Sequence, residues 1–72
     1  GLVYKILRQY PKALLYYQQA LAITKLIGDK DGEGIILNNI GAIYIELGKY
    51  QQAEKTLFIA IEALESLRQI SL

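Results

Sequence analysis

The sequence predicts an all-α protein in which antiparallel helical hairpins stack on one another. Three features indicate this fold class. Apolar residues recur at spacings of three and four, the period of helices that bury one face. The breaks between these stretches are two or three residues long, so neighbouring helices must run antiparallel. The sequence also matches itself at an offset of 40, as in Tyr10 and Tyr50 or Ala13 and Ala53.

The first two helices are predicted over residues 1–8 and 11–27. Pro11 suits the first turn of a helix, because the amide hydrogen that proline lacks has no helical partner there. Gly28 ends the second helix, since glycine adopts the left-handed conformation that closes many helices. One face of the second helix carries the periodic residues Ala13, Tyr17, Ala20, Leu21, Thr24 and Ile27.

The third helix is predicted over residues 30–47. Asp29 is placed to cap its N-terminus, and Asp31 and Glu33 form a solvated first turn that complements the helix dipole. Gly48 and the residue after it form a tight turn. The periodic residues of this helix are Ile36, Leu37, Ile40, Gly41, Tyr44 and Leu47.

The last helix is predicted over residues 50–70. Small residues such as Gly41 and Ala60 let paired helices approach closely, while Tyr44 and Tyr50 are expected to fill the core between them. Residues 57–61 are apolar on every side, and a helix of that kind is normally buried. We therefore expect self-association, and a homo-oligomer, through Leu57, Phe58, Ile59, Ile61 and Ile70.

Composition excludes several classes of function. The 72 residues are 53% hydrophobic, with net charge +1 and neither Cys nor His. Disulfides, thiolate nucleophiles and transition-metal sites built from Cys or His are therefore excluded, and we expect no enzyme activity, metal or cofactor. The low net charge argues against a nucleic-acid partner. No apolar run approaches the roughly 18 to 20 residues of a membrane span and no signal-peptide layout is present, so we expect a cytoplasmic protein without a membrane partner.

The acidic stretch after Gly28 does not make a ligand site. Counted from Asp29 as a calcium loop, the twelfth position is Ile40 where such a loop needs Glu. A phosphate-binding loop would need a Gly-Lys-Ser/Thr ending after a strand, and this stretch has neither. A solvated first turn of a helix is therefore favoured over both a calcium site and a phosphate site.

Three parts of the sequence resemble the tetratricopeptide repeat. They are the run Leu37-Asn38-Asn39-Ile40-Gly41-Ala42-Ile43-Tyr44, the turn Gly48-Lys49-Tyr50, and then Ala53, Leu57 and Ala60. An earlier, truncated copy has Gly1, Tyr4, Tyr10, Ala13, Tyr17 and Ala20 at matching positions. The resemblance implies a right-handed α-solenoid. It covers the whole chain as a single unit, with a truncated repeat over 1–28 and a second repeat plus helical tail over 29–72. We expect the chain to be a piece of a longer array.

Two features depart from the usual repeat. The period is 40 where about 34 is usual, and Lys25 and Glu65 replace the closing proline. The longer period is similar to the variant in kinesin light chains and receptors for spindle-orientation peptides, and it implies longer helices within the same architecture.

The resemblance implies a protein-binding scaffold whose concave face holds a peptide segment of a partner protein. The matching positions on that face are Leu2, Lys5, Ile6, Ile35, Asn38, Asn39, Ala42, Ile45 and Glu46. Asn39 falls where some members bind a terminal carboxylate, but Leu2 stands where that clamp needs a second Asn. A mostly apolar groove with a few polar anchors is favoured. The alternative is a self-assembly module in which another copy fills the groove.

Overall fold

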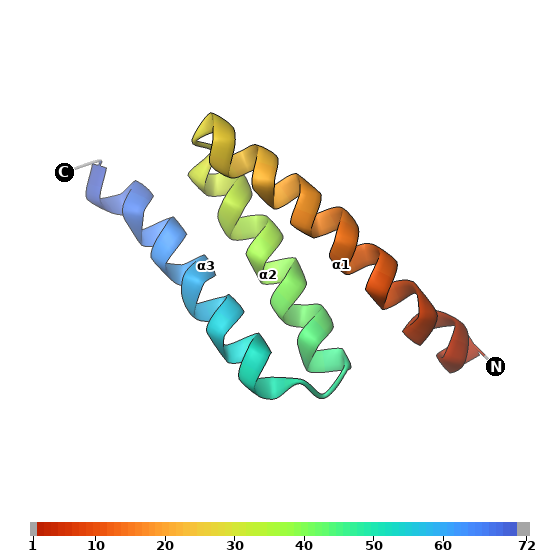
Figure 1. Cartoon of the computed structure of the whole chain (residues 1–72). Coiled ribbons are helices and arrows are strands. Elements are labelled where there is room, and N and C mark those ends of the chain that lie inside the picture. The colour runs from red at the N-terminus through yellow and green to blue at the C-terminus, as the bar shows by residue number, and fades with distance from the viewer. Residues whose placement is uncertain (1, 71–72) are drawn as a thin grey trace.

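A computed structural model describes residues 2–70 of the 72-residue chain, and side chains from residue 9 to residue 66. The described part consists of three helices, α1 (Leu2–Ile27), α2 (Lys30–Glu46) and α3 (Tyr50–Ile70), with no strand (Figure 1). The predicted all-α class is therefore confirmed.

The central helix, α2, packs antiparallel against both of its neighbours. Within the described residues, α1 and α3 do not pack on one another. With 26 residues, α1 is about 39 Å long, against about 26 Å for the 17 residues of α2. The N-terminal part of α1 therefore runs past the end of α2, as Figure 1 shows.

Both turns use the same glycine-based motif. Gly28 and Gly48 have φ values of 74° and 75°. The residue after each glycine closes the preceding helix: the Asp29 N–H donates to the Thr24 carbonyl and the Lys49 N–H to the Tyr44 carbonyl, each at 2.8 Å. These are Schellman bonds, which pair the last free carbonyls of a helix. The prediction of two glycine-closed hairpins is confirmed.

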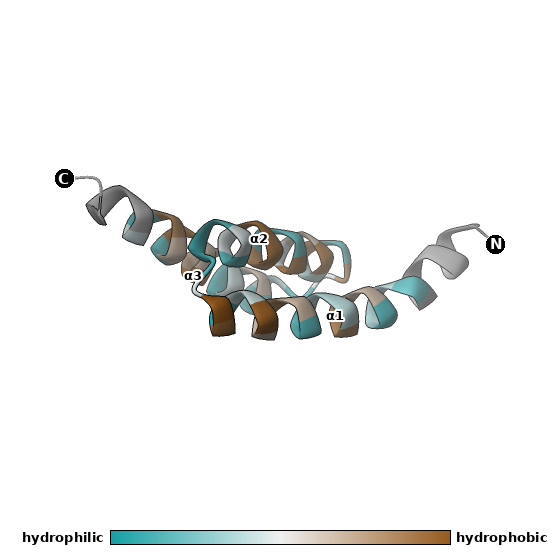
Figure 2. Cartoon of the chain, turned by 90° about the horizontal axis from the view of Figure 1, so that it is seen from above, coloured by the Kyte–Doolittle hydropathy of each residue, from teal (hydrophilic) through white to brown (hydrophobic). Residues whose placement is uncertain are grey.

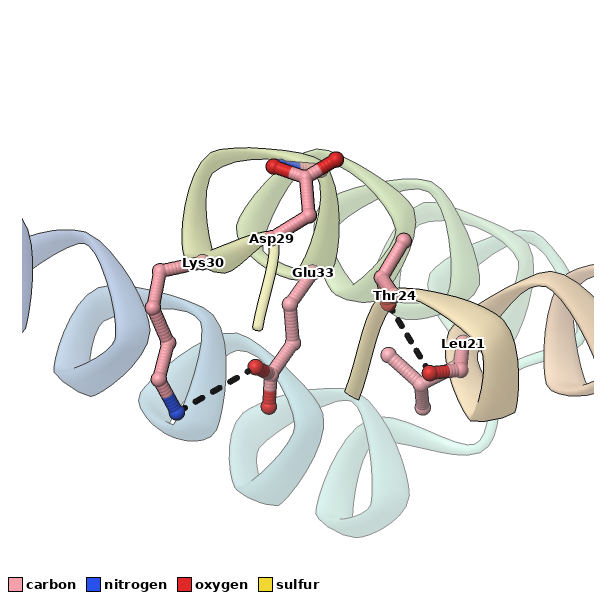
Figure 3. A network of polar contacts seen from close by, with 6 residues as sticks. Leu21, Thr24, Asp29, Lys30 and Glu33 are labelled. Atoms are coloured by element: carbon pink, nitrogen blue, oxygen red, sulfur yellow. Dashed lines mark hydrogen bonds and ion pairs between the residues drawn. The ribbon is translucent and has the colours of Figure 1, made fainter. Parts of the chain in front are cut away.

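The polar residues at the first turn are shown in Figure 3. The Asp29 carboxylate accepts from the Gly32 N–H at 2.9 Å, which confirms it as the N-cap of α2. Glu33 was expected to be solvated, but it is buried, and one of its carboxylate oxygens lies 3.5 Å from Lys30 Nζ. The difference arises because Glu33 lies on the core side of α2, whereas Asp31 is exposed.

The core is thin and depends on small residues. It contains Leu37, Ile40 and Ile43 from α2 and three alanines, Ala53, Ala60 and Ala63, from α3. Gly41 permits the closest approach, since a Cβ atom there would lie 2.6 Å from Leu57 Cδ2. No large side chain in the described part is fully buried. The hairpin thus leaves much of its apolar surface open.

The predicted break between residues 8 and 11 is wrong, because α1 is one continuous helix with Pro11 inside it. The internal repeat explains this difference. At the offset of 40, Arg8 stands where Gly48 closes α2. A left-handed turn costs a non-glycine residue roughly 1–2 kcal/mol. Without the glycine the helix continues, although Pro11 cannot donate a hydrogen bond to the Leu7 carbonyl.

Two residues predicted to be buried are exposed. Tyr50, expected in the core, has 68% of its surface exposed, and so has Ile27. Each lies next to a turn, at an end of a helix where no further element covers it. Periodicity identified the apolar character of these positions but not the missing neighbour.

Candidate binding surface

The exposed face of α2 carries a row of residues with helical spacing. Asp31, Ile35, Asn38, Ala42 and Ile45 are spaced four and three apart, so they share one face, and all five are exposed. Residues of the core, such as Leu37 and Ile40, occupy the opposite side. We call these five residues the α2 row. It presents two isoleucines and one amide to solvent.

The structure brings together most of the residues predicted for partner binding. Ile35, Asn38, Ala42 and Ile45 belong to the α2 row, and Glu46 is exposed beside it. Asn39 is half-buried, because it is one residue out of register with the row. The other predicted positions, Leu2, Lys5 and Ile6, lie outside the residues whose side chains are described.

A second row runs along α3. Glu54, Phe58, Ile61 and Glu65 are spaced four, three and four apart and are all exposed. Phe58 alone leaves 61% of its surface open. We call these four residues the α3 row. Its centre is apolar and both of its ends are acidic.

Three of the five residues predicted for self-association are exposed as expected. Phe58 and Ile61 belong to the α3 row, while Ile59 is exposed on another side of the helix. Leu57 is half-buried, because it packs on Gly41. The side chain of Ile70 lies outside the described residues.

An apolar groove lies on the surface between α2 and α3, beside these rows. It is lined by Gly34, Ile35, Asn38, Leu57, Ala60, Ile61 and Leu64. Leu64 forms part of its wall and packs on Gly34, where a Cβ atom would lie 2.8 Å from its Cγ. Although Leu64 packs there, 43% of its surface is exposed.

All seven acidic residues of the chain lie in or next to α2 and α3, and α1 contains none. Asp31 and Glu46 lie at the two ends of the exposed face of α2, and Glu54 and Glu65 at the two ends of the α3 row. Among the described side chains, no Lys or Arg lies in either row. The groove itself is lined by uncharged residues, while acidic side chains outnumber basic ones on the two helices that form it.

This arrangement suits recognition of another polypeptide. Apolar side chains can be buried on Ile35, Ile45 and Ile61, and Asn38 can exchange hydrogen bonds with a backbone. Among the described residues there is no cluster of three or more acidic side chains that could hold a metal ion. None of the described helices is both long enough and apolar enough to cross a membrane.

A further apolar face on α1 was missed. Tyr16, Ile23 and Ile27 are exposed, with Tyr16 set edge-on to Tyr17 at 5.8 Å between ring centroids. Figure 2 shows hydrophobic turns at the C-terminal end of α1. The repeat marks this face as a packing surface, because Ile23 corresponds to Ala63 at the offset of 40 and Ala63 is buried where α3 packs on α2.

The comparison with protein-family models gives a match. A family model described as tetratricopeptide repeat matches residues 1–69, nearly the whole chain. Neither the comparison with curated proteins nor that with solved structures gives a match.

Proposed function

Because the chain belongs to the tetratricopeptide repeat family, we propose that its α2 row binds a peptide segment of a partner protein. The family is a non-catalytic scaffold family that generally mediates protein–protein interaction. The observation that carries the proposal is the row itself: exposed apolar residues with one amide, on the side of α2 away from the core. The 40-residue period supports our further inference that the chain is of the long-repeat form.

The residues of the row define the peptide that it accepts. Ile35 and Ile45 offer two apolar contacts on the same face of α2, ten residues apart, which span about 15 Å of helix. Asn38 lies between them and supplies both a donor and an acceptor for a peptide backbone. The acidic residues at the ends favour a peptide with basic flanks. The half-buried position of Asn39 weighs against capture of a terminal carboxylate.

The proposal is tested by selecting peptides from a displayed library against the whole chain and measuring their affinity for variants. Ile45→Ala and Asn38→Ala should each weaken the selected peptides. For Ile45 we expect about a tenfold rise in Kd, since a buried apolar contact is worth roughly 1.5 kcal/mol. Ile59→Ala is the matched control, because Ile45 and Ile59 have 45% and 46% of their surfaces exposed. Equal losses for the two variants would contradict the proposal.

Self-assembly is the second candidate, and the exposed apolar centre of the α3 row favours it. Phe58 and Ile61 share one face of α3 and have 61% and 54% of their surfaces exposed, and a contiguous exposed apolar patch often marks an interaction site. The two candidates separate in one experiment. Ile45→Ala weakens partner binding without changing the oligomer if peptide recognition is the function. Loss of the oligomer alone supports assembly.

A further inference from the structure

The molecule has two open apolar faces on different helices. One is the groove between α2 and α3, two helices on which acidic side chains outnumber basic ones. The other is the face of α1 that carries Tyr16, Ala20, Ile23 and Ile27, which we call the α1 face. Its residues are spaced four, three and four apart, as required for one side of a helix.

The two faces differ in charge. The α1 sequence contains four basic residues and no acidic one. Lys12 precedes Tyr16 by one helical turn and is exposed on the same side. The two helices that form the groove, by contrast, carry six acidic residues and two basic ones between residues 30 and 66. An apolar surface on a basic helix and an apolar groove between two helices of net negative charge are electrostatically complementary.

The repeat indicates what the α1 face is shaped to meet. Ala20 and Ile23 correspond to Ala60 and Ala63 at the offset of 40. Ala60 and Ala63 are buried, since α3 packs on α2 through them. In α1 the corresponding Ile23 is exposed, because α1 packs on α2 through a different side, around the buried Thr24. The α1 face is thus a helix-packing surface without a helix on it.

We propose that copies of this chain associate head to tail, with the α1 face of one copy seated in the groove between α2 and α3 of the next. The interface is heterologous, so a dimer retains one free groove, on one copy, and one free α1 face, on the other. Association therefore continues beyond the dimer as concentration rises. The inference rests on the self-assembly candidate and not on peptide binding, and it identifies the two surfaces that meet.

Sedimentation velocity on the purified whole chain over a range of concentrations tests the proposal. The wild type should form species that grow past a dimer. Ile61→Asp places a charge in the groove and Ile23→Asp places one in the α1 face, and each should lower the association constant at least about a hundredfold. Both positions are exposed, so circular dichroism should show the same helix content for each variant.

The decisive measurement is the mixture of the two variants. Ile61→Asp keeps an intact α1 face, and Ile23→Asp keeps an intact groove. An equimolar mixture should therefore form a dimer that cannot grow, with the wild-type dissociation constant. An assembly in which only α3 surfaces meet would instead leave Ile23→Asp fully associated. That outcome, or a mixture that stays monomeric, overturns the proposal.

Two controls address specificity and charge. Ala22→Asp places a charge on an exposed side of α1 away from the α1 face and should leave association unchanged; an equal loss would indicate nonspecific clustering and overturn the proposal. A double variant with Glu54→Lys and Glu65→Lys should associate several-fold more weakly at low salt. When it is mixed with a second variant that carries Lys12→Glu, part of the lost affinity should return. No change on charge reversal would contradict the assigned pairing of faces. These measurements contain no peptide, so their failure leaves the peptide-binding proposal standing.

Discussion

Replacement of Gly41 by alanine tests the close packing of α2 on α3. The added Cβ would lie 2.6 Å from Leu57 Cδ2 and 2.7 Å from Leu57 Cγ, where carbon atoms prefer about 3.5–4.0 Å. The shortfall is therefore about 1 Å. Rotation about χ2 cannot relieve it, because Cγ lies on that rotation axis. The helices must move apart, or Leu57 must leave its rotamer.

Two opposing terms set the expected magnitude. Overpacking of this kind costs about 1–3 kcal/mol, whereas glycine to alanine inside a helix stabilises by about 1 kcal/mol. We expect Gly41→Ala to lower the free energy of unfolding by about 1 kcal/mol. In a Leu57→Ala background the obstructing atoms are absent, so the same change should raise the free energy of unfolding by about 1 kcal/mol. The sign of the effect should reverse.

The assay is urea unfolding followed by circular dichroism at one protein concentration for all four members of the double-mutant cycle. The fixed concentration matters because association also contributes to apparent stability. Gly34→Ala is the comparison, since its obstacle is Leu64, which is 43% exposed and can move into solvent. We expect a smaller loss there. If Gly41→Ala is stabilising in both backgrounds, the close approach is not required and the packing argument fails.

Three further changes test the local elements. Gly48→Ala should cost about 1 kcal/mol from its φ of 75° alone, since nothing lies within 4 Å of the new Cβ; an unchanged urea midpoint would contradict this. Asp29→Ala removes the acceptor of the Gly32 N–H and should cost about 1 kcal/mol, while Asp29→Asn should retain most of the stability. Equal losses for these two variants would show that the cap is unimportant. Arg8→Gly should speed native-state hydrogen exchange at residues 8–12, because the helix there loses about 1 kcal/mol and gains a residue able to turn. Unchanged exchange would refute our explanation for the continuous α1.

Features that depend on a few neighbouring residues could be predicted from the sequence. The turns at Gly28 and Gly48 and the cap at Asp29 were correct, because their geometry arises from one glycine or one carboxylate and the adjacent backbone. The hairpins followed from short connections, and Gly41 was recognised as a contact because it recurs with the repeat. The exposed apolar residues at the centre of α3 were also anticipated. Residues 57–61 are apolar on every side of the helix, so a neighbour on one side cannot cover them all, and Phe58 and Ile59 are exposed.

Local rules failed where two of them competed. Pro11 favours a helix start, but the position that would have to turn is Arg8, and a turn without glycine is costly. The continuity of α1 depends on the sum of these terms along 26 residues. In the same way, Glu33 looked like a solvated first-turn acid, although the core side of α2 includes its position.

The helical class, the repeat and its period, the two hairpin turns and the apolar character of each helix face follow from local conformational preference and spacing, so they could be predicted from the residues alone. Which apolar faces are covered is known only from the packing of the three helices. Leu37 and Ala60 are buried while Tyr50, Ile23 and Ile61 are exposed, although all five are apolar positions of their helices. Burial is a property of what lies opposite a side chain, and spacing along one helix carries no information about a neighbour that is absent. The two open faces and the opposite charges beside them therefore became apparent only when the three helices were packed together.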